Sequence, residues 1–376
     1  MYIGPGSTAQ QFTQPLHKFH KSVSHIRSLG LGLLPSIPLY NQQAFPILSW
    51  KASFIHPDHS TLKQESKALQ LLTNGPFNAI PNDLLHNLKQ IGLPAQAHSL
   101  RTTSLASRSR NALYTMHNYH DNIKLLQDHY LHDDAVLHPP LQHWIDNSML
   151  ISLHDAIRTT QPIRQQISTT TNIQKQLTSL LLPTYHKHDL KQLLRRRWAR
   201  FFTTTQLQPA IDNAIDNLQF ITTTCKPCTT SAIIKTWLYG WTTNSRFGNI
   251  SQPCPLCNSP NSDTLRHFYD CPPLTTAARN ILGQPYLPNT RDYFFLATNY
   301  VTAQYNYRSI LQLNAIHIYC ITNTYHAIKH NPHNDIQDTY HACLKRLLQH
   351  DPRLINIYLL SQSTQLYDHN SQPPPP

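Results

Sequence analysis

One short segment constrains this chain more than any other, because it places three cysteines and a histidine at the spacing C-x2-C-x9-H-x3-C. The four potential ligands are Cys254, Cys257, His267 and Cys271. The first pair flanks a tight turn, in which both thiolates can face one point. We expect Asp263 to cap a short helix on which His267 and Cys271, four residues apart, share one face.

Pro272 and Pro273 directly follow the fourth ligand, and we expect them to end that helix, because the residue before a proline is driven out of the α region. Three thiolates and one imidazole are typical of a closed structural zinc site. The segment therefore predicts a small CCHC zinc knuckle that holds one structural Zn²⁺.

Cys225 and Cys228 form a second C-x2-C pair, for which three interpretations stay open. The pair could join the first two downstream cysteines in an all-thiolate site and leave the other two ligands unused. It could be redox-active, although no thioredoxin-like βαβ pattern surrounds it. It could also bind no metal, because the downstream set is complete by itself.

The composition favours an intracellular protein with an anionic partner. Its 376 residues include 31 Lys and Arg against 19 Asp and Glu, which gives a formal net charge of +12. Seven cysteines, three of them in a metal-like cluster, fit a reducing compartment better than a disulfide framework. We find no signal peptide, no apolar run of about 18 residues to enter a membrane, and no pattern for a small-molecule substrate.

The 24 histidines are weak evidence for sites, since the chain is also rich in Thr, Gln, Asn and Pro, and Glu65 is its only glutamate. Such a skew is typical of nucleotide bias in a gene. His267 is singled out by its spacing and not by its residue type.

Apolar residues recur at three-to-four spacing along most of the chain, and alternation at period two is short everywhere. We therefore predict a mainly α fold. Residues 12–34 should be helical, with Phe19, Val23 and Ile26 facing inward. Thr61 and Gln64 are expected to form the capping box of the next helix.

Residues 189–202 predict a basic amphipathic helix that begins with a capping box of Asp189 and Gln192. One face is apolar and the other is basic, so a contact with phosphate backbone and a merely solvated face are equally good interpretations. Two basic residues near the knuckle are further candidates. The nucleic-acid candidates are Lys191, Arg195, Arg196, Arg200, Lys235 and Arg246.

A helical stripe of large apolar residues connects the two cysteine pairs. Its members are Ile233, Ile234, Trp237, Leu238 and Trp241. The stripe could be a base-stacking platform, but core packing against the knuckle is the favoured interpretation.

Several short motifs also follow one another in a particular order. They are Ile3-Gly4-Pro5-Gly6, Tyr40-Asn41, Ala44-Phe45-Pro46-Ile47, Glu65 with Ala68-Leu69, Gly75-Pro76, and Trp241-Thr242-Thr243 with Arg246-Phe247 before the first cysteine pair of the knuckle. In this order they resemble reverse transcriptases of non-LTR retrotransposons, from the end of the catalytic palm to the C-terminal zinc knuckle. The resemblance covers about residues 1–130 and 230–275.

This resemblance implies a C-terminal fragment of an RNA-directed DNA polymerase that grips RNA or DNA, and it implies a nuclear location. It divides the chain into a palm-to-thumb entry (1–60), a thumb-like helical domain (61–130), a helical connector (131–230), a zinc-knuckle module (231–275), a C-terminal helical segment (276–350) and a flexible Pro-rich tail (351–376).

The polymerase carboxylates of such proteins belong to a Y-x-D-D turn, which would lie upstream of Met1. The nearest imitation is the segment 130–134, where Tyr130 is one residue too far from Asp133 and Asp134. We interpret this pair as a solvated helix end, and residues 272–376 lack the clustered carboxylates of a nuclease. We therefore expect no catalytic residue and no primer extension by the isolated chain. The alternative is a domesticated zinc-dependent protein-interaction or RNA-binding protein.

Overall fold

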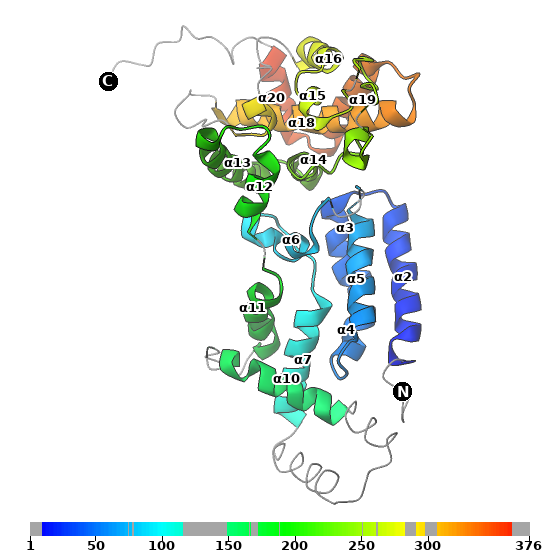
Figure 1. Ribbon diagram of the computed structural model, residues 1–376, viewed down its shortest axis with the longest axis vertical. Coiled ribbons are helices and arrows are strands. Elements are labelled where there is room, and N and C mark those ends of the chain that lie inside the picture. The colour runs from blue at the N-terminus through cyan, green and yellow to red at the C-terminus, as the bar shows by residue number, and fades with distance from the viewer. Residues whose placement is uncertain are drawn as a thin grey trace, which may run out of the picture.

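The computed structural model describes residues 10–73, 75–76, 79–115, 149–164, 166, 172–187, 189–249, 251–260, 262–282, 291–297 and 307–362. Within these ranges the chain consists of helices and their connections, without a strand, which confirms the mainly α fold. The helices gather into two lobes that lie one above the other along the longest axis of the molecule (Figure 1).

The N-terminal lobe contains the helices before residue 188. They are α2 (Thr13–Ser28), α3 (Leu33–Leu39), the π-helical turn η1 (Tyr40–Ala44), α4 (Phe45–Ala52), α5 (His59–Leu72), α6 (Asn82–His86), the 3-10 turn η2 (Leu88–Ile91), α7 (Leu100–Thr115), α10 (Met149–Arg164) and α11 (Ile173–Tyr185). As the spacing predicts, Phe19, Val23 and Ile26 of α2 are buried in the core of this lobe. The helix predicted over residues 12–34 is, however, interrupted after Ser28, where Gly30 and Gly32 adopt positive φ before α3 begins.

The cap of α5 differs from the predicted capping box of Thr61 and Gln64. The helix begins earlier, and the side chain of Asp58 accepts a hydrogen bond of 2.7 Å from the Thr61 backbone N–H. Gln64 lies one turn further on and contacts Nε2 of His20 across the helix pair at 2.6 Å. An Asp at the N-cap was the stronger of two competing local signals.

Among the described residues of this lobe, Glu65 is the one buried carboxyl group. Its Oε1 accepts hydrogen bonds from the Leu100 backbone N–H at 2.7 Å and from the Tyr40 hydroxyl at 3.2 Å. Glu65 thereby satisfies the first N–H of α7 and joins three elements. Burial raises the pKa of this carboxyl group to about 7, although both hydrogen bonds act in the opposite direction.

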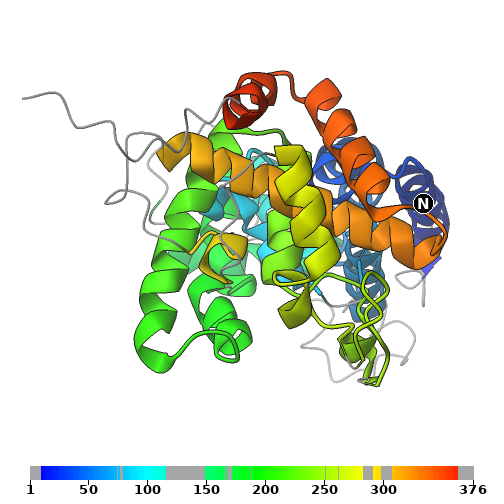
Figure 2. The same ribbon diagram turned by 90° about the horizontal axis from the view of Figure 1, so that it is seen from above.

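The C-terminal lobe contains the helices after residue 188. They are α12 (Leu190–Trp198), α13 (Thr204–Thr224), α14 (Pro227–Trp237), the 3-10 turn η3 (Asn244–Phe247), α15 (Leu265–Phe268), α16 (Pro272–Leu282), α17 (Arg291–Phe294), α18 (Tyr307–His330), α19 (Ile336–His350) and α20 (Arg353–Gln362). Helix α18 crosses this lobe (Figure 2) and packs against α13, α14, α19 and α20.

Helix α12 forms as the sequence predicts. The Asp189 side chain accepts a hydrogen bond of 3.1 Å from the Gln192 backbone N–H. The apolar stripe of α12 is buried, and the ring of Trp198 meets that of Trp237 edge-on at 5.5 Å between centroids. The basic helix is therefore anchored by its apolar face to α14, and its exposed face carries the arginines.

The segment predicted as one connector, residues 131–230, is divided between the two lobes. Helices α10 and α11 pack on α7 around a small separate core that includes Leu105, Ala156 and Leu177. Helices α12 and α13 instead belong to the C-terminal lobe. The division has a simple physical reason, since each helix pair buries its apolar stripe against its nearest apolar neighbours. Asp133 and Asp134 lie outside the described residues.

The prediction of a flexible tail over residues 351–376 is wrong for the first part of that segment. Residues Arg353–Gln362 form α20, and Leu354 is fully buried against the C-terminal lobe. Asp351 before it is also buried, where its carboxylate accepts from the Lys226 backbone N–H at 2.7 Å. Residues 363–376, with the four final prolines, lie outside the described residues.

The two lobes meet where α3 packs on α14. Beside this contact, two glycine-containing loops approach each other, and a Cβ atom added to Gly75 would lie 3.4 Å from the carbonyl oxygen of Gly240. A Cβ atom on Gly240 would lie 3.1 Å from the Lys235 carbonyl oxygen, so this turn is built around the absence of a side chain. None of the helices in the described ranges has the length and apolar character needed to cross a membrane.

Candidate metal centre and the adjacent arginine cleft

The first two ligands of the candidate metal centre lie on a turn that the backbone closes tightly. The Asn258 N–H donates to the Cys254 carbonyl oxygen at 2.9 Å, and the Cys254 N–H donates to the Ser259 carbonyl oxygen at 2.9 Å. Asn258 adopts the left-handed conformation with φ of 56°, which asparagine tolerates better than most residues. The Leu256 N–H points at the Cys254 sulfur at 3.4 Å, as expected for a thiolate ligand.

The other two ligands are placed differently from the prediction. Thr264, and not Asp263, caps α15 and accepts from the His267 N–H at 3.2 Å. The helix ends at Phe268, so Cys271 lies beyond it and not on the same helical face as His267. Pro272 begins α16 instead of only ending α15, since proline is well tolerated in the first turn of a helix.

All four predicted ligands nevertheless converge. Their ligand atoms lie within 4.8 Å of one another, in a group that could hold a metal ion. The Cys254 and Cys271 sulfurs are 3.9 Å apart, and the Cys257 sulfur lies 3.1 Å from His267 Nε2. With zinc–sulfur bonds of about 2.3 Å, tetrahedral geometry requires about 3.8 Å between two sulfurs and about 3.5 Å between sulfur and nitrogen. The side chains therefore fit a tetrahedral ion.

The electrostatics of the group also favour a bound cation. A hydrogen bond from the Cys271 thiol lowers the pKa of Cys254 to about 5, and the Leu256 N–H adds to this effect. The pKa of Cys271 is in turn raised, because its proton is held between the two sulfurs and the group is buried. Several thiols that share one site cannot all ionise without a counter-charge, and a divalent metal would supply it.

Asp263 connects the four candidate ligands, which we call the metal group, to the rest of the lobe. Its buried carboxylate accepts from the Asn244 N–H at 2.7 Å, from the Tyr325 hydroxyl at 3.0 Å and from Lys329 Nζ at 3.3 Å. A residue predicted as a helix cap is thus a junction between η3, the knuckle and α18. No short-range pattern signals this role, because Tyr325 and Lys329 lie far along the chain.

The tryptophan stripe is core, as favoured from the sequence. Trp237 and Trp241 are each 1% exposed. Trp241 stacks on Phe268 and on Tyr325, with 5.2 Å between ring centroids and 28° between ring planes in both pairs. Trp241 therefore supports the knuckle from beneath and is not presented to bases.

The second cysteine pair does not join the metal group. Across the ranges that the structure describes, Cys225 and Cys228 belong to no group of three or more potential metal ligands. Cys225 follows the last residue of α13, where burial raises the pKa of its thiol to about 12. This leaves the downstream set as the metal-binding candidate.

The six predicted nucleic-acid contacts fall into three places. Lys191 and Arg195 face α13, where Lys191 Nζ pairs with Asp212 at 2.6 Å and Arg195 Nε donates to Gln208 at 2.7 Å. Lys235 lines a different cleft, between the lobes. Arg196, Arg200 and Arg246 come together beside the knuckle. The predicted basic face of α12 is therefore split.

The three converging arginines belong to a cleft of about 810 Å³ that we call the arginine cleft. Two further arginines, which the sequence analysis did not select, complete its basic lining. The residues of the arginine cleft that bear on binding are Arg196, Arg197, Arg200, Arg246, Arg266, Tyr239 and Phe247. No acidic side chain occurs among the described residues that line it. The three-arginine run in α12 and the place of Arg266 beside His267 were the signals that could have revealed the two missed residues.

Contacts within the cleft hold its arginines in place. The guanidinium of Arg200 lies 5.0 Å from the centroid of the Tyr239 ring, and Arg246 donates to the Tyr239 carbonyl oxygen at 2.5 Å. Arg197 donates to the Leu238 carbonyl oxygen. Burial and the neighbouring arginines lower the pKa of Arg197 to about 10. Positive charge is therefore concentrated in this cleft, whose described lining residues include no carboxylate.

No protein-family model, no curated protein and no solved structure matches this chain, so its function has to be inferred from the residues described above.

Proposed function

We propose that this chain binds nucleic acid through the phosphate backbone in the arginine cleft, and that a zinc ion holds the adjacent knuckle in shape. The single observation that carries the proposal is the convergence of five arginines on one cleft next to the metal group. Guanidinium groups bind phosphate oxygens in pairs and release counterions from nucleic acid on contact.

Zinc is the metal that suits this group best. Three thiolates and one imidazole form a soft, tetrahedral set, whereas magnesium and calcium require oxygen ligands. The donor set is complete, with no fourth position left open for a substrate, so the role of zinc here is structural and not catalytic. Arg266 stands next to the ligand His267, and loss of the ion would therefore disturb one wall of the arginine cleft.

The aromatic residues of the cleft suit a single strand. Phe247 at its rim is 65% exposed. Exposed rings beside a basic groove stack with unpaired bases irrespective of sequence. Single-stranded RNA or DNA with little sequence preference is therefore the expected ligand.

We further propose that the chain is the thumb-and-knuckle region of a non-LTR retrotransposon reverse transcriptase. The motif order in the sequence supports this, as do the mainly helical fold and the convergence of the CCHC ligands. In such a polymerase the arginine cleft would grip template or product, and the expected location is the nucleus.

The test is the salt dependence of binding to fluorescent single-stranded RNA and to duplex DNA. The exposed arginines of the cleft are replaced together, as Arg196→Gln, Arg200→Gln and Arg266→Gln. The slope of log K against log salt is negative for such binding. If each arginine meets one phosphate, the magnitude of this slope should decrease by roughly 2 units on single strands and by nearly 3 on duplex.

A matched control removes the same charge elsewhere on the lobe, as Lys191→Gln, Arg195→Gln and Arg279→Gln. We expect this variant to retain most of the wild-type slope, because Lys191 and Arg195 already face Asp212 and Gln208. Equal slopes for the two variants, or no binding by the wild-type chain at low salt, would refute the arginine cleft as the site. The interaction-protein alternative would then be the better interpretation.

A further inference from the structure

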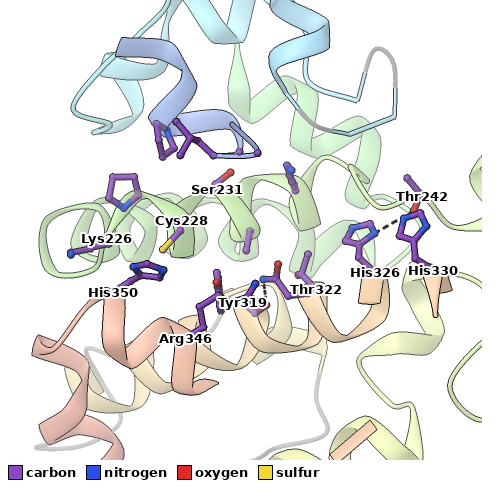
Figure 3. A pocket seen from close by; sticks show the side chains of 18 residues that line it. Lys226, Cys228, Ser231, Thr242, Tyr319, Thr322, His326, His330, Arg346 and His350 are labelled. Carbon is purple, nitrogen blue, oxygen red and sulfur yellow. Dashed lines mark hydrogen bonds between the residues drawn. The ribbon is translucent and has the colours of Figure 1, made fainter. Parts of the chain in front are cut away.

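A second cleft, which we call the interlobe cleft, lies between the two lobes and has a volume of about 700 Å³. Its walls are α14, α18 and α19 of the C-terminal lobe and the turn between α2 and α3 of the N-terminal lobe (Figure 3). This volume is within the range of cavities that bind small ligands. Lys235, one of the predicted nucleic-acid contacts, lies in this cleft.

Basic side chains dominate the charge of the interlobe cleft. They are Lys226, Lys235, His326, His330, Arg346 and His350. No aspartate or glutamate occurs among the described residues that line it. Figure 3 shows His326 and His330 together at one end, beside Thr242, and Lys226 and His350 toward the other. Basic side chains therefore line the cleft toward both ends.

The carboxylates closest to these walls are already engaged. Asp351 follows His350, but its oxygens accept from the Lys226 backbone N–H at 2.7 Å and from Arg353 Nε at 2.7 Å. Asp263 is held by Lys329, Tyr325 and the Asn244 backbone. Neither carboxylate is among the described residues that line the cleft.

Burial is the main influence on the ionisable groups at the histidine end. Burial, and then the positive charges of Lys235, His330 and Lys329, lower the pKa of His326 to about 4. Burial also lowers the pKa of Lys235 to about 8. His326 keeps a neutral contact with the Thr242 hydroxyl at 3.4 Å. An anion placed here would favour the charged forms of both groups and raise their pKa values.

We propose that the interlobe cleft is a binding site for a phosphate-bearing anion with more than one charged group. Phosphate suits the site because it offers several acceptor oxygens to donors that come from different directions. A single small anion would reach only one end, whereas an oligophosphate, or consecutive phosphates of a strand, would meet both. The site is separate from the arginine cleft, and its occupancy does not depend on that cleft.

A ligand bound in the interlobe cleft would also contact the junction between the two lobes. Gly30 and Gly32 in the α2–α3 turn have φ of 64° and 78° and bring backbone, not charge, to the cleft wall. A ligand seated on α14 and α18 would cover this turn. Binding should therefore protect the amides of residues 30–34 from hydrogen exchange.

The experiment uses the full chain with its metal and three probes: inorganic phosphate, tripolyphosphate and a short single-stranded RNA. Exposed donors of the cleft are replaced together, as His330→Gln, Arg346→Gln and His350→Gln. The control replaces exposed residues of the same types outside it, as His333→Gln, Arg279→Gln and His341→Gln. Affinity is followed by calorimetry, and folding of each variant is checked by circular dichroism.

We expect tripolyphosphate to bind the wild-type chain and the control with similar affinity, and the cleft variant about tenfold or more weakly. The cleft variant should also lose the protection of residues 30–34. Tighter binding of RNA than of tripolyphosphate, with the same loss in the cleft variant, would identify a nucleic-acid strand as the source of the phosphates. If no probe binds, or if the cleft variant and the control bind alike, the proposal is wrong. The variant with Arg196→Gln, Arg200→Gln and Arg266→Gln should keep tripolyphosphate binding, which separates this outcome from failure of the arginine cleft.

Discussion

Glu65 offers a direct test of the electrostatics of the N-terminal lobe. The change is Glu65→Gln, which keeps the size and one acceptor oxygen of the side chain but removes its ionisation. In the folded chain this carboxyl group is buried, with a pKa raised from 4.5 to about 7. Two donors, the Leu100 N–H at 2.7 Å and the Tyr40 hydroxyl at 3.2 Å, favour the charged form, but burial has the larger effect.

The direction of the pH dependence follows from these values. Between pH 4.5 and pH 7 the unfolded chain has lost the Glu65 proton while the folded chain still holds it. The folded state therefore binds more protons, and its stability falls as pH rises through this window. At 1.36 kcal/mol per pKa unit the full contribution is about 3 kcal/mol, of which roughly 2.5 kcal/mol is lost between pH 5 and pH 8.

The assay is urea unfolding of the wild-type chain and of Glu65→Gln at several pH values between 5 and 8. The difference between the two proteins is the useful quantity, because every other titrating group, including the metal ligands, contributes equally to both. Amide exchange in α5 and α7 identifies the unfolding of the N-terminal lobe in particular. The stability of the variant relative to the wild type should rise by roughly 2–3 kcal/mol from pH 5 to pH 8. A difference that is flat, or that falls with pH, would show that the two donors outweigh burial and that the reasoning is wrong.

Two further predictions concern the C-terminal lobe. Cys257→Ser should release the metal and loosen residues 251–282, because metal binding and local folding are one equilibrium. Elemental analysis measures the bound metal, with Cys343→Ser as the control that should keep the ion. Full metal retention in Cys257→Ser would contradict the ligand set. Leu354→Ala should lower the free energy of unfolding by about 2–4 kcal/mol, because Leu354 is fully buried. Leu359→Ala, on the exposed side of α20, should lower it by less than about 0.5 kcal/mol. Equal effects in urea unfolding would mean that α20 does not pack on the lobe.

The ligands of the metal group could be predicted because their signal is local. A C-x2-C turn positions two sulfurs whatever the rest of the chain does, and the later His and Cys need only return to the same point. The details of that return could not be predicted. Thr264 and Asp263 are both good caps at adjacent positions, and the choice between them depends on Tyr325 and Lys329, which hold Asp263 from another helix.

The same distinction explains the basic residues. Periodicity predicts that α12 has an exposed basic face, and the structure confirms that its apolar stripe is buried. Periodicity says nothing about α13, whose Asp212 and Gln208 meet Lys191 and Arg195. The pairing partner lies on a helix whose position depends on tertiary packing, so a sequence pattern cannot separate engaged side chains from those that remain available.

The metal group and the arginine cleft are structurally connected within the C-terminal lobe. Helix α12 carries Arg196 and Arg197, and Arg200 follows two residues after its end. This segment is anchored by Trp198, which packs on Trp237 of α14. The other two, Arg246 and Arg266, lie on η3 and α15, short elements with little core of their own. These elements are held by the Asp263 junction and by the four metal ligands. These short elements bury little apolar surface of their own, so a metal ion bound by the four candidate ligands would stabilise the positions of Arg246 and Arg266.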